Sequence, residues 1–183
     1  MKKNNISRNI KWAVTLLAIV ISGTAVSQNS KSDKRIIADA ATAQAEFIKV
    51  DGLMKNLFNN AYGYVIFPNV GKGGLGIGGA SGNGIVYEKG KMIGKARLTQ
   101  VNIGFQAGGQ AYREVIFFEA KKDIDRFKEN KLQFSAQASA VAATAGASGN
   151  AKYADGVMIF TQQKGGLMYE ASIGGQTFRF RKF

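Results

Sequence analysis

The spacing of hydrophobic residues changes near residue 61, which predicts two kinds of secondary structure. Between residues 33 and 60, apolar side chains recur every three to four residues, as they do along one face of a helix. Ile36 and Ile37 belong to this stripe, and basic residues flank it. The stripe breaks at Asp51-Gly52 and resumes at Leu53, so we expect two consecutive amphipathic helices.

From Tyr62 onward the spacing becomes alternate and glycine-punctuated, which is typical of antiparallel strands. We expect chain reversals at Pro68-Asn69, at residues 81–84 and at residues 89–91. Residues 121–130 carry one apolar and one charged side and predict a short helix. Residues 134–145 stay open, because their alternation favours a strand and their alanine content favours a helix.

Together these elements predict an α+β fold. N-terminal amphipathic helices precede a strongly curved, glycine-rich antiparallel sheet or small barrel, with one short helix inserted. Gly-Gly pairs recur within or beside the predicted strands, where glycine usually accompanies bulges and sharp bends. In the closing strand, 177–181, we expect phenylalanine to face inward and Arg179 and Arg181 to face outward as part of a basic patch.

Residues 1–27 have the pattern of a secretory signal peptide. A basic start without acidic residues leads into an apolar run, Trp12 to Ile21, which is too short to span a bilayer. Small residues follow, with Ala25 and Ser27 placed for cleavage before Gln28. We therefore expect an exported protein, periplasmic or associated with the cell envelope.

Composition argues against most catalytic chemistry. The chain has no His and no Cys, so histidine- or cysteine-based catalysis, thiolate or imidazole metal sites and disulfides are excluded. Gly74, Gly76 and Gly79 match a dinucleotide-binding pattern, but a turn and a strand follow them where that motif needs a helix. We expect no enzyme, no metal and no cofactor.

The excess of basic residues points to an anionic partner. The full chain has 25 Lys and Arg against 12 Asp and Glu, a net charge of +13. Residues 1–27 contain four basic and no acidic residues, so residues 28–183 carry +9. Nucleic acid is disfavoured because export removes the chain from it and because the strand aromatics alternate as core residues do.

Two glycine-rich blocks connect the sequence to a known family. Residues 60–79 (NAYGYVIFPNVGKGGLGIGG) and 102–110 (NIGFQAGGQ), together with Gly165-Gly166-Leu167, resemble the SYLF lipid-binding domain, also known as an actin-binding domain of eukaryotic endocytic proteins. The blocks Lys72–Gly79 and Gly104–Gln110 are the family-typical ones. The resemblance implies a compact α+β domain that binds anionic lipid with help from an N-terminal amphipathic helix. Export makes actin an unsuitable partner.

We therefore predict a signal peptide at 1–27, a helical segment at 28–56 and a SYLF-like domain at 57–183. The expected function is association with anionic phospholipid membranes through the basic amphipathic helix and a basic surface. The alternative is a structural or interaction protein of the envelope that binds a protein or polyanion. The predicted lipid-binding residues are Lys34, Arg35, Ile36, Ile37, Lys49, Lys55 and Lys72.

Overall fold

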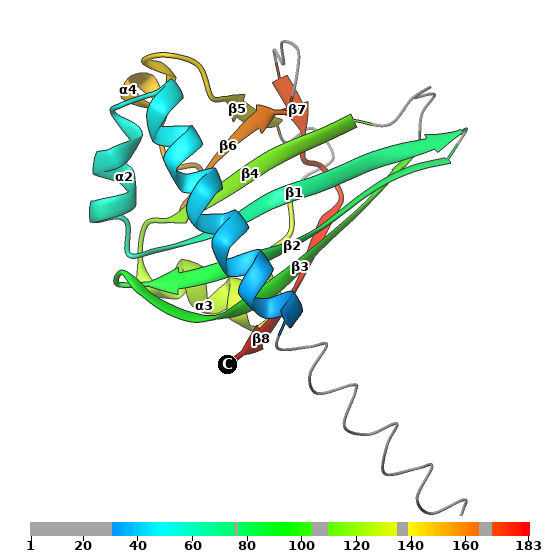
Figure 1. Cartoon of the computed structure of the whole chain (residues 1–183), viewed down its shortest axis with the longest axis horizontal. Coiled ribbons are helices and arrows are strands. Elements are labelled where there is room, and N and C mark those ends of the chain that lie inside the picture. The colour runs from blue at the N-terminus through cyan, green and yellow to red at the C-terminus, as the bar shows by residue number, and fades with distance from the viewer. Residues whose placement is uncertain (1–30, 76, 104–109, 135–138, 165–169) are drawn as a thin grey trace, which may run out of the picture. The chain divides into compact units, whose positions relative to one another are not determined.

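A computed structural model describes residues 31–75, 77–103, 110–134, 139–164 and 170–183 (Figure 1). The predicted signal peptide, 1–27, lies outside the described residues. The chain divides into two compact units, residues 1–37 and 38–183. The described part of the first unit, residues 31–37, is helical.

The second unit opens with helical residues 38–50 and then alternates helices with strands. Its helices are α2 (Met54–Asn60), α3 (Lys121–Lys128) and α4 (Ala147–Asn150). Its strands are β1 (Gly63–Leu75), β2 (Ile77–Glu88), β3 (Lys91–Ile103), β4 (Gln110–Phe118), β5 (Ser139–Ala142), β6 (Val157–Gln163), β7 (Glu170–Ser172) and β8 (Gln176–Lys182). The predicted α+β class is confirmed.

The strands form one eight-stranded sheet with the order β7-β5-β6-β4-β1-β2-β3-β8. Neighbours pair antiparallel except β5 and β6, which are parallel. Within the part of the chain that the structure describes, β7 and β8 are edges and no pairing joins them. The sheet is therefore open, and the small-barrel form of our prediction is wrong.

A β-bulge at Pro68 lies in β1, the centre of the sheet. The register of β1 shifts against β2 between Ile66 and Asn69, and against β4 between Phe67 and Val70. Proline has no N–H to donate to a ladder, so a strand tolerates it at a bulge. Because the bulge adds one residue, Phe67 and Val70 face the same core. The predicted turn at Pro68-Asn69 is thus wrong, since the strand continues through it.

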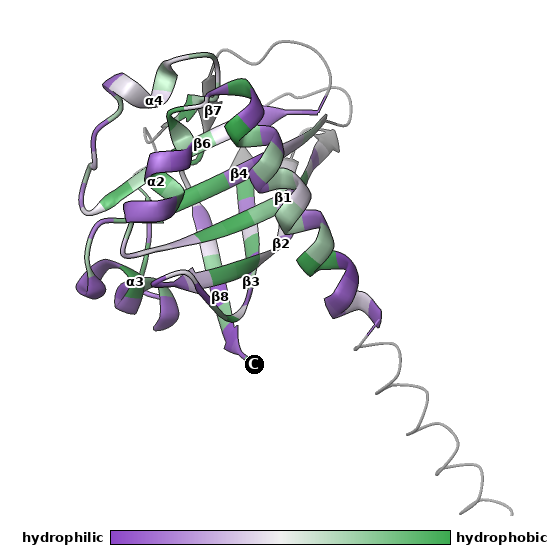
Figure 2. Ribbon diagram, turned by 60° about the vertical axis from the view of Figure 1, so that its left-hand side comes forward, coloured by the Kyte–Doolittle hydropathy of each residue, from purple (hydrophilic) through white to green (hydrophobic). Residues whose placement is uncertain are grey.

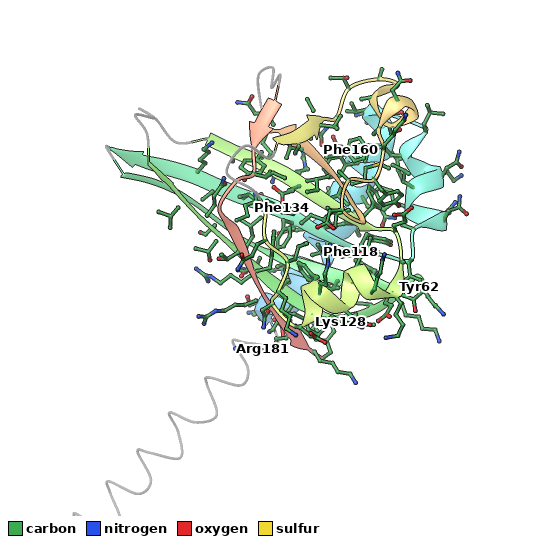
Figure 3. The ribbon with its side chains drawn as sticks, turned by 180° about the vertical axis from the view of Figure 1, so that it is seen from behind. Tyr62, Phe118, Lys128, Phe134, Phe160 and Arg181 are labelled. Carbon is green, nitrogen blue, oxygen red and sulfur yellow. The ribbon has the colours of Figure 1, made fainter. Side chains whose placement is uncertain are left out.

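The two faces of the sheet are covered by different helices. On one face, Ile124 and Phe127 of α3 pack with Phe118 and Phe178 in the main core cluster. On the other, α2 places Phe58 against Tyr64 and Phe117, with ring centroids 5.1 and 4.9 Å apart. Figure 1 shows the helix of residues 38–50 crossing this second face with α2 beside it, and Figure 3 shows α3 from the opposite side.

Two reversals test the turn chemistry read from the sequence. Lys89 and Gly90, between β2 and β3, have φ of +49° and +73°, which is the left-handed pair that a tight hairpin requires. Residues 81–84, by contrast, continue β2, so the turn predicted there is wrong. Glycine at position 84 has another cause: a Cβ would lie 2.6 Å from both the Ile66 carbonyl oxygen and the Phe67 ring.

The open segment 134–145 contains strand β5 (Ser139–Ala142), so alternation outweighs the helix propensity of alanine there. Residues 135–138 lie outside the described residues. The short α4 follows, which the sequence did not predict. The helical residues end at 50 and α2 begins at Met54, which places their junction at the Asp51-Gly52 break.

We predict that Gly84→Ala destabilises the protein by about 1–3 kcal/mol, because the added methyl overpacks against Ile66 and Phe67. Gly71→Ala is the matched control, since a Cβ at Gly71 meets nothing within 4 Å. Urea unfolding followed by circular dichroism measures both. Equal stability of the two variants would contradict the close approach at Gly84.

Candidate functional site

The predicted lipid-binding residues lie in three parts of the chain. Lys34 and Arg35 are exposed, and Ile36 and Ile37 are half-buried, on the helical residues 31–37 of the first unit. In the second unit, Lys49 and Lys55 are exposed and flank the corner between residues 38–50 and α2. Lys72 is half-buried in β1, where it pairs with Ala80 and Gln110. Among the predicted residues of the second unit, Lys49 and Lys55 flank one corner, and Lys72 lies apart from them in β1.

That corner is built around Asp51, which is almost fully buried. Its carboxylate accepts hydrogen bonds from the backbone N–H of Leu53, at 3.0 Å, and from that of Ser148 in α4, at 2.8 Å. Burial alone would raise the pKa of Asp51, but hydrogen bonds from Ser148, Leu53 and Gly146 outweigh it and lower the pKa. The corner is therefore pinned to α4, and it presents Leu53 with 51% of the side chain exposed.

A buried polar cluster, which the sequence did not reveal, lies on the α3 face of the sheet. Glu114 of β4 is fully buried, and its Oε2 accepts a hydrogen bond of 2.9 Å from Nε2 of Gln176 in β8. Thr161 of β6 lies directly opposite Glu114 in the ladder and is also fully buried. Within the described part of the chain, Glu114 Oε1, Thr161 Oγ1 and Gln176 Oε1 have no hydrogen-bond partner. The sequence shows Glu114 beside an apolar run, but only the structure shows that its carboxyl group is buried in the core.

Burial raises the pKa of Glu114 to about 7, and the hydrogen bond from Gln176 opposes the shift only in part. Burial likewise raises the pKa of the neighbouring Tyr112, and the Glu114 charge adds to that rise. Isolated buried charge of this kind is costly, so the carboxyl prefers its neutral form inside the fold. The raised pKa of Glu114 predicts that the stability of the fold depends on pH.

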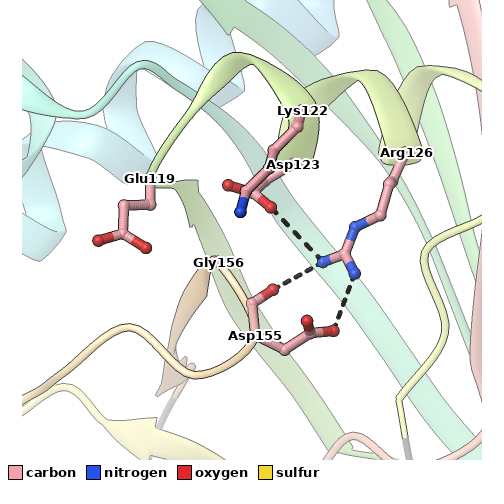
Figure 4. A pocket seen from close by; sticks show the side chains of 6 residues that line it. All are labelled: Glu119, Lys122, Asp123, Arg126, Asp155 and Gly156. Atoms are coloured by element: carbon pink, nitrogen blue, oxygen red, sulfur yellow. Dashed lines mark hydrogen bonds and ion pairs between the residues drawn. The ribbon is translucent and has the colours of Figure 1, made fainter.

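A shallow surface pocket lies between α3 and the start of β6 (Figure 4). Arg126 donates to the Asp155 carboxylate at 2.9 Å and to the Asp155 carbonyl oxygen at 2.6 Å, and it lies 3.8 Å from Asp123. Asp123 accepts a hydrogen bond from the Ala120 N–H at the start of α3. These contacts anchor α3 to the turn before β6. Arg126, Asp123 and Asp155 therefore already bind one another and stabilise the fold.

The described residues contain no group of three or more His, Cys, Asp or Glu side chains that could hold a metal ion. Among the same residues, no helix is both long enough and apolar enough to cross a membrane. In β8 the alternation is as predicted: Phe178 is buried, and Arg179 and Arg181 are exposed.

Residues 99–182 match the model of the family described as Ysc84, Las17-binding protein actin regulator. This is the SYLF family, so the resemblance read from the sequence is confirmed for that part of the chain. The matched part, somewhat under half of the chain, contains the block at 104–110, while the block at 72–79 lies before it. Residues 104–109 are not among the described residues. A comparison with curated proteins finds no match.

The C-terminal part of the chain is thus similar to an actin- and lipid-binding family, which agrees at that coarse level with the predicted function. The matched range runs from β3 through β8 and includes the buried polar cluster around Glu114. It does not include the helical residues 31–60.

We predict that Glu114 makes the protein less stable as pH rises from about 4.5 to about 7. In that window the folded protein retains a proton that the unfolded chain, at the ordinary value of 4.5, has released. Glu114→Gln cannot ionise, so its melting temperature should fall less than that of the wild type between pH 5 and pH 8. The exposed Glu119→Gln should keep the wild-type difference. An unchanged pH difference in Glu114→Gln would contradict the assignment.

Proposed function

We propose that the protein is an exported lipid-binding module that associates with anionic phospholipid membranes of the cell envelope. The observation that carries the proposal is the corner at Asp51–Leu53. There a half-exposed leucine stands between exposed Lys49 and Lys55. Apolar side chains beside lysines suit the boundary between head groups and acyl chains. The family match at residues 99–182 supports a lipid-binding role.

The predicted basic and apolar residues would have different roles at the membrane. Lys34, Arg35, Lys49 and Lys55 would meet the head groups, where each cation near an anionic surface contributes about 1 kcal/mol. Ile36 and Ile37, which are half-buried on the helical residues 31–37, would insert their exposed parts into the membrane surface. Lys72, half-buried in β1, would support the contact only indirectly. The signal-peptide pattern of residues 1–27 supports a location outside the cytoplasm.

We expect the protein, purified after expression of the full chain, to sediment with vesicles that contain phosphatidylglycerol and not with vesicles of pure phosphatidylcholine. Binding should weaken as salt rises from 50 to 500 mM, because salt screens exposed charges. Failure to bind phosphatidylglycerol vesicles at low salt would overturn the proposal. Capture of one saturable protein partner without vesicle binding would favour the interaction-protein alternative.

Leu53→Ser should weaken vesicle binding by roughly three- to tenfold, since it removes exposed apolar surface at the corner. Its stability should change little, because the side chain is half exposed. Val141→Ser, an exposed apolar position on β5, is the matched control and should bind like the wild type. Equal affinities of the two variants would show that the corner does not insert.

A further inference from the structure

The positive charge of the protein is concentrated in two neighbouring strands. β3 and β8 contain six basic residues and no acidic residue: Lys91, Lys95, Arg97, Arg179, Arg181 and Lys182. These strands pair antiparallel, and β8 is an edge of the sheet. Since residues 28–183 carry +9 in all, two strands supply +6 of it.

The helical residues 31–60 carry a much smaller net charge than these two strands. Between residues 31 and 60, five basic residues are offset by four acidic ones, a net charge of +1. Asp33, Asp39 and Glu46 are interspersed among the cations of that segment. Long-range attraction to an anionic surface depends on summed charge, so the strands dominate it and the helical segment does not.

The register of β3 and β8 gathers four of these cations on one face. Lys95 lies opposite Arg181, and Arg97 lies opposite Arg179. Successive residues of a strand face opposite sides, and the intervening Ala96, Leu98 and Phe178 are buried in the core. The four cations therefore project from the other side of the sheet. We call them the basic strand face.

The arrangement costs stability when no anion is present. Like charges directly opposite each other in an antiparallel pair repel, with Cβ atoms about 5 Å apart. Arg97 and Arg179 form such a pair. Arg97, Arg179 and Arg181 are exposed and form no ion pair within the described part of the chain. A bound layer of anions would relieve that repulsion.

Exposed apolar side chains border the same two strands. Among the described residues, Met92 and Val101 of β3 are 38% and 66% exposed, and Phe183, just after β8, is 56% exposed. Val101 lies opposite Gly79 and shares the parity of Arg97, while Phe183 shares that of Arg181. The Phe183 N–H donates to the Ile93 carbonyl, so Phe183 extends the pairing of β8 with β3. Figure 3 labels Arg181 near this end of β8, away from the core rings of Phe118 and Phe134.

We infer that the basic strand face is a membrane contact surface, on which Lys95, Arg97, Arg179 and Arg181 bind phospholipid phosphates while Val101 and Phe183 enter the head-group layer. The inference rests on the proposed function and assigns most of its electrostatic attraction to β3 and β8. The apolar border favours a bilayer over a soluble polyanion, because a polyanion offers exposed apolar side chains no place to insert. Figure 2 shows the C-terminal end of β8 as strongly hydrophilic.

The direct test replaces the three exposed arginines with threonine, a good strand former, in Arg97→Thr/Arg179→Thr/Arg181→Thr. With three cations lost near an anionic surface, partitioning onto phosphatidylglycerol vesicles should fall by about 100-fold. The matched control, Lys122→Ser/Lys131→Ser/Lys152→Ser, removes three exposed lysines elsewhere and should lose no more than about threefold. Circular dichroism confirms that each variant is folded.

A second measurement does not depend on changing charge. The chain contains no cysteine, so Val101→Cys can be labelled with an environment-sensitive fluorophore. On addition of phosphatidylglycerol vesicles its emission should shift to the blue, whereas the same label at Lys122→Cys should not shift. This variant keeps every arginine and serves as the test if the triple variant fails to fold.

The outcomes separate this inference from the function it rests on. No binding of the wild type to phosphatidylglycerol vesicles overturns both. Binding of the wild type with equal affinity of the triple variant and its control, or with no shift at Val101→Cys, overturns the strand face alone. Loss of heparin or DNA binding in the triple variant, with vesicle binding unchanged, would assign the face to a soluble polyanion instead and overturn the inference.

Discussion

The bulge at Pro68 is the constraint on which the rest of the sheet depends. β1 is hydrogen-bonded on both sides, and both ladders change register at the same place. One extra residue keeps Val65, Phe67 and Val70 on a single core face, where an unbroken alternation would turn Val70 outward. Next to the bulge, β2 lies so close to Ile66 and Phe67 that a Cβ at position 84 would clash with both. The extra residue thus keeps the same face of β1 buried on both sides of the bulge.

The sequence predicts the elements whose cause is local. The hairpin at Lys89-Gly90 follows from turn chemistry, and the alternating burial of β8 follows from the order of its phenylalanines and arginines. The break at Asp51-Gly52 is local as well. In each case neighbouring residues determine the conformation, so no distant contact is needed to find it.

Elements whose cause is distant were mispredicted or missed. Glycines at 82 and 84 resemble a turn, but they exist because β1 approaches β2 closely there. Pro68 resembles a strand end, but two neighbouring strands hold it within β1. Glu114 interrupts an apolar run, and its partner Gln176 lies 62 residues away. The site residues show the same limit, because helical amphipathicity is visible in sequence while the pairing of arginines across β3 and β8 is a matter of register.

The position of β8 has a consequence for how copies of the protein meet in solution. An edge strand offers unpaired backbone groups to any passing strand, and lysine and arginine on an edge discourage such pairing. Two β8 edges that approached each other would bring three cations of one copy against three of the other. The same side chains therefore oppose edge-to-edge aggregation. Their mutual repulsion is strongest when no anionic partner is bound to neutralise their charge.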